Sequence, residues 1–242
     1  LAIEEIDNDG YANAAMNNLA YYYETIAKDY PNAEKYYLLA CNAGNGIAMH
    51  NLARYYNDIK KDYPSSEKYY LLACEAGNNT AMHDLGVFYE DIKKDYINAE
   101  KYYLMACETG NSDSMHNLGY FYHYITKDYD NAEKYYLLAH KLGNGYAINN
   151  LPRFYENILK DYKKAEKYYR LACKTEGVTG LHNLALFYDK QHKYVEAEKY
   201  YLLASEAGDK ESMTNLALLY EYIKKDYPNA EKYYLIACEH GN

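Results

Sequence analysis

The sequence contains no run of apolar residues approaching the ~20 that a transmembrane helix needs, so no membrane segment is expected in this chain. It also lacks a basic excess, because the formal net charge is −9 and most lysines stand beside glutamate or aspartate. A nucleic-acid-binding protein is expected to carry a basic face, so nucleic acid is not an expected partner. The composition, 49% hydrophobic and 25% charged with 36 tyrosines, suits a soluble folded chain.

Catalytic motifs are also missing. The sequence has no nucleophile elbow, no phosphate-binding loop, no zinc-protease helix and no Cys/His arrangement typical of a nucleophile. We therefore expect no enzymatic activity, no cofactor and no metal site in these 242 residues. A catalytic region outside them remains an alternative.

What the sequence does contain is a repeat. The string E-K-Y-Y recurs with a spacing of 33 residues, except for one spacing of 32, and a ladder of leucines recurs with it. The string starts at Glu34, Glu67, Glu100, Glu133, Glu166, Glu198 and Glu231. The leucines are Leu19, Leu52, Leu85, Leu118, Leu151, Leu184 and Leu216. Seven repeats are predicted, at about 12–44, 45–77, 78–110, 111–143, 144–176, 177–208 and 209–242.

Each repeat is predicted to form two helices, here called helix A and helix B. In helix A, Met49, Leu52 and Tyr56 fall on one helical stripe. Helix B begins at an N-cap such as Asp29, and its spacing places the packed face on positions 33, 37 and 40. Three prolines are expected in the first turn of helix B, where a missing N–H costs little. Glycines at 44, 77, 110, 143 and 208 are expected to end helix B in the left-handed conformation.

A unit of two short helices cannot bury its own apolar face, so the units are expected to stack side by side. The predicted fold is all-α, a right-handed α-solenoid of about seven helix-turn-helix repeats that forms a single array over residues 1–242. Helix A is expected on its concave face and helix B on its convex face. Both ends resemble cut ends of a longer solenoid, because Leu1-Ala2 looks like the end of a helix B.

The segment Ala73–Gly86, A-C-E-A-G-N-N-T-A-M-H-D-L-G, resembles the Sel-one-like repeat, a relative of the tetratricopeptide repeat. The resemblance covers essentially the whole chain. Repeat six differs from the other repeats at 184–188 and 193–198, where it resembles the tetratricopeptide pattern more closely. It is also one residue shorter between its two helices. The resemblance implies adaptor or scaffold roles with protein or peptide partners, and implies no enzymatic activity.

The cysteines and four of the histidines each occupy one equivalent position along the array. Equivalent positions in neighbouring repeats should lie ~10 Å apart, beyond the ~7 Å limit for a disulfide and too far to share a metal. The thiols are therefore expected to be free and small buried groups, which fits an intracellular, reducing compartment. The cysteines are Cys41, Cys74, Cys107, Cys173 and Cys238, and the histidines are His50, His83, His116 and His182.

The outward positions of helix A are candidate partner-binding residues, because the resemblance places this face in a concave groove. The position before the ladder leucine is Asn18, Asn51, Asp84, Asn117, Asn150, Asn183 and Asn215, and His50, His83 and His116 precede three of these. An amide can donate to and accept from an extended peptide. The alternative is that these side chains brace the loop between repeats.

The position two after the ladder leucine varies: Tyr21, Arg54, Val87, Tyr120, Arg153, Leu186 and Leu218. Partner specificity is expected at such a position, with Arg54 and Arg153 suited to carboxylates. The alternative is drift at a solvent-facing position.

Helix B carries a line of leucines on its polar side: Leu38, Leu71, Leu104, Leu137, Leu202 and Leu235, with Arg170 in the fifth repeat. We call this line the leucine ridge. Exposed leucines would form a convex contact surface, and the alternative is that each folds between adjacent B helices.

Two functions follow. The first is a scaffold or adaptor that binds partners in the concave groove. The second is a structural protein of a large viral or cellular particle that self-associates through the leucine ridge. Pro152, directly after Leu151, is predicted to kink the fifth helix A or to delay its start to about Asn149 or Asn150.

Overall fold

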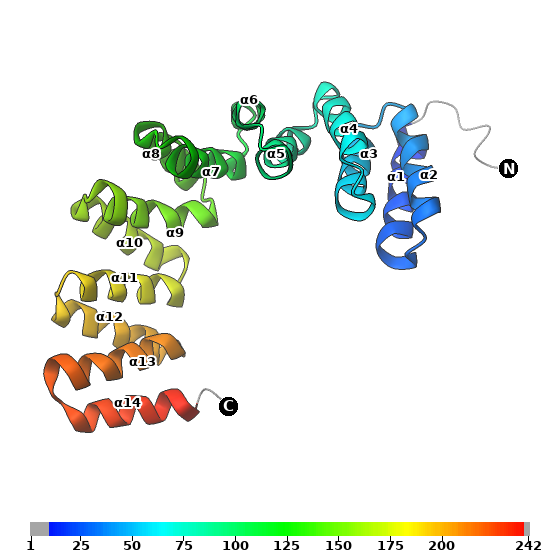
Figure 1. The fold of residues 1–242 in the computed structure, drawn as a ribbon. Coiled ribbons are helices and arrows are strands. Elements are labelled where there is room, and N and C mark those ends of the chain that lie inside the picture. The colour runs from blue at the N-terminus through cyan, green and yellow to red at the C-terminus, as the bar shows by residue number, and fades with distance from the viewer. Residues whose placement is uncertain (1–9, 240–242) are drawn as a thin grey trace. The chain divides into compact units, whose positions relative to one another are not determined.

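The computed structural model describes residues 10–239, which form fourteen α-helices and no β-strand (Figure 1). This confirms the all-α fold of paired helices. The A helices are α1 (Gly10–Tyr22), α3 (Gly46–Tyr55), α5 (Asn79–Phe88), α7 (Ser112–Phe121), α9 (Gly145–Phe154), α11 (Val178–Lys190) and α13 (Lys210–Leu218). The B helices are α2 (Tyr30–Asn42), α4 (Tyr63–Glu75), α6 (Tyr96–Glu108), α8 (Tyr129–Lys141), α10 (Tyr162–Thr175), α12 (Tyr194–Glu206) and α14 (Tyr227–Glu239).

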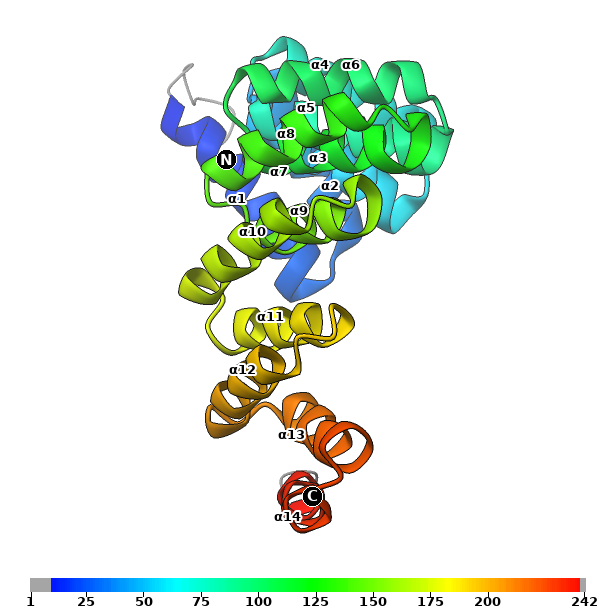
Figure 2. The ribbon, with the colours of Figure 1, turned by 90° about the vertical axis from the view of Figure 1, so that its left-hand side faces the viewer.

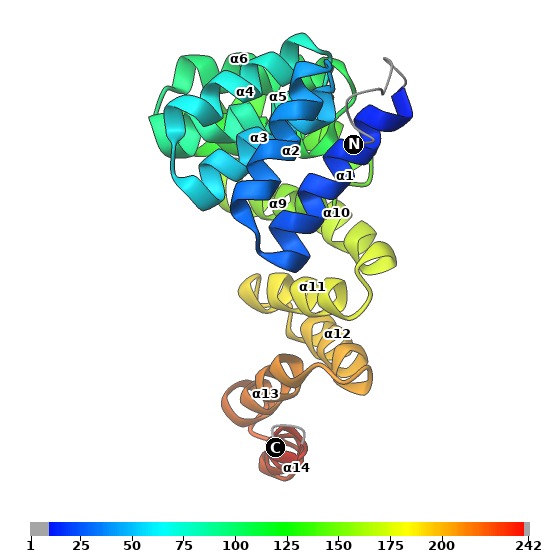
Figure 3. The same cartoon turned by 90° about the vertical axis from the view of Figure 1, so that its right-hand side faces the viewer.

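The helices gather into two compact units, Leu1–Tyr135 and Tyr136–Asn242, with the boundary inside α8. Within each unit the helices alternate between two layers. In the second unit, α10 and α12 lie on one side while α11 and α13 lie on the other (Figures 2 and 3). In the first unit, α5 lies below α6 in Figure 1. Each unit therefore presents an A-helix face and a B-helix face.

The ends of helix B follow the predicted signals. The Asp29 carboxylate accepts a hydrogen bond from the Asn32 backbone N–H at 3.2 Å, and Pro31 lies in the same first turn. The five predicted glycines after helix B all have φ between 76° and 92°, which a side chain would strain. The aspartate cap and the glycine are therefore local signals for where helix B begins and ends.

The packed face of helix B is also as predicted. Ala33, Tyr37 and Ala40 are all fully buried. Small residues after the ladder leucine permit the close approach of helix B, because a Cβ added at Gly86 would lie 2.6 Å from Cδ1 of Tyr103. The core is thus built from alanines and glycines on one helix and tyrosine rings on the next.

Tyrosine rings also join the two helices of each repeat. The first tyrosine of the E-K-Y-Y string stacks on the tyrosine four residues after the ladder leucine of its own repeat, for example Tyr69 on Tyr56 at a centroid distance of 5.7 Å. The same stack forms in every repeat, in the pairs Tyr23–Tyr36, Tyr89–Tyr102, Tyr122–Tyr135, Tyr155–Tyr168, Tyr188–Tyr200 and Tyr220–Tyr233. This explains much of the unusual tyrosine content.

The junction between the two helices was not predicted. In six repeats, helix A ends in a π-helical turn such as Tyr56–Lys60, followed by a lysine such as Lys61 in the left-handed conformation. Repeat six has no π-helical turn, and α11 continues as an α-helix to Lys190. A π-helical turn holds one extra residue relative to an α-helix. In repeat six, Leu184 and Glu198 are separated by 14 residues instead of the usual 15. The residue that repeat six lacks is therefore the extra residue of the π-helical turn.

The predicted late start of the fifth helix A is wrong. Helix α9 runs over Gly145–Phe154 with Pro152 inside it, the same length as α3. The reason is its cap: the Asn144 side chain accepts a hydrogen bond from the Ala147 N–H at 2.9 Å, as Asn45 does for α3. The cap fixes the start of the helix at Gly145, four residues before Asn149.

Candidate functional site on the A-helix face

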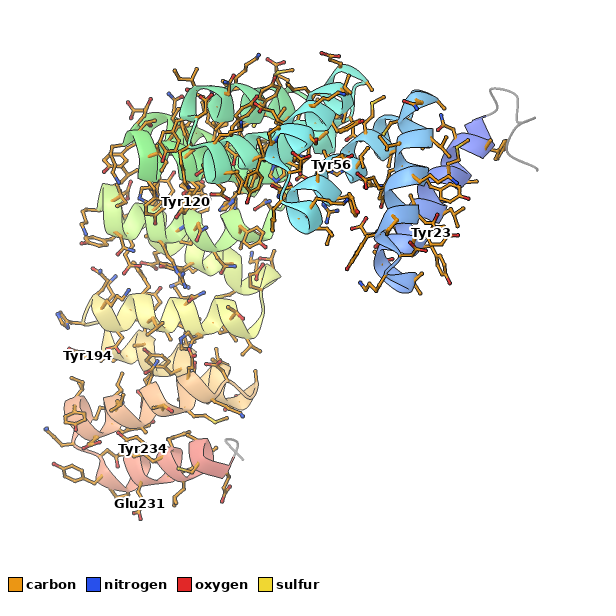
Figure 4. The ribbon with its side chains drawn as sticks, turned by 45° about the vertical axis from the view of Figure 1, so that its right-hand side comes forward. Tyr23, Tyr56, Tyr120, Tyr194, Glu231 and Tyr234 are labelled. Atoms are coloured by element: carbon orange, nitrogen blue, oxygen red, sulfur yellow. The ribbon has the colours of Figure 1, made fainter. Side chains whose placement is uncertain are left out.

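The glutamates of E-K-Y-Y join neighbouring repeats. The Tyr56 hydroxyl donates to Glu34 at 2.8 Å and the Lys60 ammonium contacts the same carboxylate at 3.0 Å. We call this arrangement the glutamate joint. It recurs as Tyr89–Glu67, Tyr122–Glu100 and Tyr188–Glu166, with a lysine on Glu67, Glu166 and Glu198 as well. Tyr56 lies at this boundary in Figure 4.

The predicted asparagine and histidine ladder forms a second set of links between repeats. The His50 Nε2 lies 2.7 Å from an Asp84 carboxylate oxygen in the next repeat. The Asn51 amide donates to Asn17 at 2.9 Å, and the Asn183 amide donates to Asn149 at 3.4 Å. These contacts support the bracing role that was the alternative for this ladder.

Other ladder residues lie in similar surroundings. The His83 Nδ1 lies 2.8 Å from the Ser114 hydroxyl of the next repeat, and burial lowers the pKa of His83. The His116 Nδ1 lies 3.2 Å from Asn117, and burial also lowers the pKa of His116. These rings are therefore mostly neutral at pH 7. The His83 contact joins α5 to α7, whereas the His116 contact to Asn117 lies within α7.

The remaining predicted positions differ in exposure. Asn18 is exposed, whereas Asn150 and Asn215 are half-buried. Arg153 is exposed and its guanidinium donates to Asn183 at 3.2 Å. Arg54 is exposed on α3. Of the predicted ladder and variable positions, the structure brings Arg54, Asp84 and Val87 together in one recess.

That recess lies between α3 and α5 in the first unit and has a volume of about 200 Å³. We call it the A-face pocket. It is lined by Arg54, Asn57, Asp58, Tyr70, Asp84, Val87, Phe88, Asp91 and Ile92. At about 30 Å³ per water molecule, this volume holds six or seven waters or one long side chain. The pocket therefore has room for a single peptide side chain.

The floor of the A-face pocket lacks a hydrogen bond that five of the other repeats form. In five repeats, the second tyrosine of E-K-Y-Y donates to a carboxylate 12 or 13 residues earlier: Tyr37–Glu24, Tyr103–Glu90, Tyr169–Glu156, Tyr201–Asp189 and Tyr234–Glu221. In repeat two the corresponding pair is Tyr70 and Asn57, and no hydrogen bond joins them. Tyr70 is only 4% exposed, and its ring packs on Phe88 at 5.9 Å.

The Asn57 amide explains the missing bond. Its Nδ2 donates to Asp58 at 2.8 Å, which fixes the amide orientation because a carboxylate can only accept. The Asn57 Oδ1 is then a buried acceptor, and no donor reaches it within the described part of the chain. Tyr70 stays protonated at neutral pH because burial raises its pKa, and Asp84 and Asp58 add to the shift. The pocket therefore offers one unused buried acceptor and one unused hydroxyl.

The sequence analysis missed Asn57 and Tyr70. Aligning the repeats with one another would have shown Asn57 where other copies carry Glu24, Glu90, Glu156, Asp189 and Glu221. The functional meaning of this difference depends on Tyr70, whose partner can be named only when the helix packing is known.

The leucine ridge is largely covered. Leu38, Leu71, Leu104, Leu137 and Leu202 are half-buried, and Leu38 packs against the core of the first repeats. Leu235 on α14 is 58% exposed and borders a recess of about 380 Å³ with Tyr234 and Glu231 (Figure 4). The half-burial of the five internal leucines favours the alternative in which they fold between B helices.

The five cysteines are free thiols. Burial raises the pKa of Cys41, Cys74 and Cys107 to about 12, so these thiols are poorly ionised at neutral pH. Residues 10–239 contain no group of three or more His, Cys, Asp or Glu side chains placed to hold a metal ion. None of the described helices is both long and apolar enough to span a bilayer.

Comparison with known families agrees with the helical pairs. The Sel1 repeat model matches seven segments: 13–45, 46–78, 80–111, 112–144, 154–174, 180–209 and 210–242. The chain belongs to the Sel1 repeat family. Sel1 repeat proteins are generally scaffolds for interactions between proteins. No match was found among curated proteins.

Solved structures support the same Sel1 repeat fold. A Sel1 repeat protein from Oxalobacter formigenes superposes with a TM-score of 0.61 at 22% identity, covering 92% of this chain and 98% of that one. The protein pilF of Pseudomonas aeruginosa gives a TM-score of 0.57 at 21% identity, covering 78% of this chain and 89% of that one. At these identities the likeness concerns the fold alone.

Proposed function

We propose that this Sel1 repeat chain is a non-enzymatic scaffold that binds protein partners on its A-helix face. The observation that carries this is the contrast between two sets of positions on that face. The ladder positions are occupied with links between repeats, such as His50 to Asp84. The variable positions include exposed side chains of different chemistry, such as Tyr21, Tyr120 and Arg54. The hydrogen bonds between repeats use the ladder side chains, so the exposed side chains at the variable positions remain available to contact a partner.

The B-helix face supports the same choice. Its leucines are half-buried in the internal repeats, and its glutamates are engaged in the glutamate joints. Its exposed side chains include lysines such as Lys35, Lys68 and Lys101, but the internal ridge leucines do not form an open apolar surface. Self-association through the leucine ridge is therefore the weaker candidate.

The test is to select peptides from a displayed random library with the wild-type chain, and to measure the dissociation constants of the selected peptides by calorimetry. Tyr120→Ala and Val87→Asp change the A-helix face, and Lys101→Asp changes an exposed position on α6 as the matched control. Truncating a contact residue commonly costs 1 kcal/mol or more, about five- to tenfold in affinity. We expect that loss only in the A-face variants. Loss of affinity in Lys101→Asp alone would place binding on the other face and overturn the proposal.

A further inference from the structure

The A-face pocket has a marked imbalance of charge. Three of its lining residues are carboxylates, Asp58, Asp84 and Asp91, and Arg54 is the only cation among the nine. His50 contacts Asp84 at 2.7 Å, but no lysine or arginine forms a salt bridge with Asp58 or Asp91 among the described residues. Carboxylates in a partly enclosed recess attract a cation more strongly than they would in open water.

The uncharged polar groups point to a ligand that donates hydrogen bonds. The Asn57 Oδ1 is buried without a donor, so the partial negative charge of this oxygen adds to that of the carboxylates. The neutral Tyr70 hydroxyl can also accept a hydrogen bond through its oxygen. An ammonium or guanidinium brings only donors, so it complements this set of acceptors.

The apolar lining suits the rest of such a side chain. Val87, Phe88 and Ile92 line the pocket together with the polar groups. The long methylene stems of lysine and arginine cover apolar surface while the charged head remains among polar groups. A volume of about 200 Å³ accommodates one such side chain.

We propose that the A-face pocket binds a basic side chain, lysine or arginine, of a partner protein. The stem lies on Val87 and Ile92, and the charged head donates hydrogen bonds to the carboxylates of Asp58 and Asp91. This deepens the scaffold function proposed above and rests on it. The pocket lies between repeats two and three, and the next boundary differs because Tyr103 there is bound to Glu90.

The proposal reverses the expectation for Arg54. The sequence assigned Arg54 to a partner carboxylate, whereas here it opposes the bound cation. Replacing Arg54 should therefore strengthen binding of a basic side chain and would weaken binding of an acidic one. The sign of this single effect separates the two ligand classes.

The experiment is an NMR titration of the 242-residue chain with N-acetyl-lysine-N′-methylamide and with the corresponding arginine derivative. The norleucine and glutamate derivatives are the uncharged and acidic controls. We expect the basic probes to shift backbone amides of α3 and α5, and the norleucine and glutamate probes to leave them unchanged. Which basic probe binds more tightly distinguishes lysine from arginine.

Variants then test the assigned groups. Asp58→Asn and Asp91→Asn should each lower the affinity for the basic probe about tenfold, as expected for the loss of a hydrogen bond to a charged group. Arg54→Gln should strengthen binding of the basic probe. Glu75→Gln removes one negative charge at an exposed end of α4, as the two Asp→Asn variants do in the pocket, and should have no effect.

Equal binding of norleucine, or loss of binding in Arg54→Gln, would overturn the proposal. If peptides selected on the A-helix face keep their affinity in all four variants while the basic probe does not bind, the scaffold function stands and the pocket assignment fails. If no selected peptide responds to Tyr120→Ala or Val87→Asp, the scaffold proposal itself fails.

Discussion

Tyr56 and Glu34 belong to different repeats, and their side chains are joined by a hydrogen bond of 2.8 Å that closes the boundary between them. Lys60 reaches the other oxygen of the same carboxylate at 3.0 Å. The tyrosine and the lysine come from the end of one helix A segment, and the glutamate comes from the preceding helix B. The glutamate of the recurring E-K-Y-Y string is thus also a contact residue between neighbouring repeats.

The first prediction concerns the glutamate joint. Tyr89→Phe removes the donor to Glu67 while leaving the ring and the Lys93 contact in place. Because the lost bond is to a charged, half-buried carboxylate, we expect a loss of about 1–2 kcal/mol in the free energy of unfolding, measured in urea. Tyr96→Phe is the control, since Tyr96 is 40% exposed and should change stability by less than about 0.5 kcal/mol. Equal losses in both variants would show that the joint contributes nothing.

The second prediction restores an internal bond. Asn57→Glu copies Glu24 and Glu90, which accept from Tyr37 and Tyr103 at 2.7 and 2.8 Å. The new carboxylate should accept from Tyr70 and raise the free energy of unfolding by about 0.5–1.5 kcal/mol. Asn57→Gln is matched in size and lacks the charge, so it should gain less. A destabilised Asn57→Glu in urea would mean that burying the carboxylate costs more than the bond contributes.

The third prediction is a pH dependence. Burial lowers the pKa of His83 in the folded chain below the ordinary value of 6.5, so the unfolded chain binds a proton more readily. The stability from neutral His83 is present above pH 6.5 and is lost as the pH falls through the lowered folded value. We expect the urea midpoint to decrease from pH 7.5 to 5, and to decrease less in His83→Gln. Parallel pH profiles for the two proteins would contradict this assignment.

The fourth prediction concerns thiol reactivity. Cys238 is exposed, whereas Cys41 and Cys74 are buried with pKa values raised to about 12. Iodoacetamide reacts with the thiolate, so at pH 7.5 the first label should appear on Cys238. Mass spectrometry of peptides after brief labelling gives the order of reaction. In urea all five thiols should react at similar rates, and early labelling of Cys41 in the folded chain would contradict its burial.

The fifth prediction tests the leucine ridge. Arg170 occupies the ridge in repeat five, where its guanidinium donates to Glu166, Tyr188 and Tyr200 at 3.1, 2.6 and 2.9 Å. In Leu71→Arg the same partners are available at Glu67, Tyr89 and Tyr102, so the cost should be within about 1 kcal/mol.

The control for Leu71→Arg is Leu71→Asp, whose short side chain cannot reach these partners and should cost more. Thermal melting measures stability, and sedimentation measures self-association. Lost self-association with an unchanged melt would support assembly through the ridge. A collapsed melt for Leu71→Arg would show that Leu71 belongs to the core.

The presence of two helices in each repeat could be predicted from the sequence alone. Their periodicity, the Asp29 cap and the glycine at 44 are local signals, and each acts within a few residues of where it stands. The repeat also predicts the buried face of Ala33, Tyr37 and Ala40, because stacking demands one apolar side per helix.

The contacts between repeats could not be predicted in the same way. Whether Glu34 faces water or Tyr56 depends on the angle between adjacent repeats, and no local pattern encodes that angle. The A-face pocket depends further on one exception, Asn57, whose significance appears only beside Tyr70. The π-helical turns were missed because an α-helix with one extra residue has nearly the same apolar pattern as one without it.

The π-helical turn gives the chain a place where its length can change by one residue. Each residue of an α-helix turns the chain by about 100°, so a deletion inside a packed helix would rotate half of it away from the core. Repeat six has lost one residue at this junction, yet Tyr188 still reaches Glu166 at 2.8 Å. Single-residue deletions should therefore be tolerated periodically along the chain, once per repeat, and natural variation in repeat length should accumulate at that same junction.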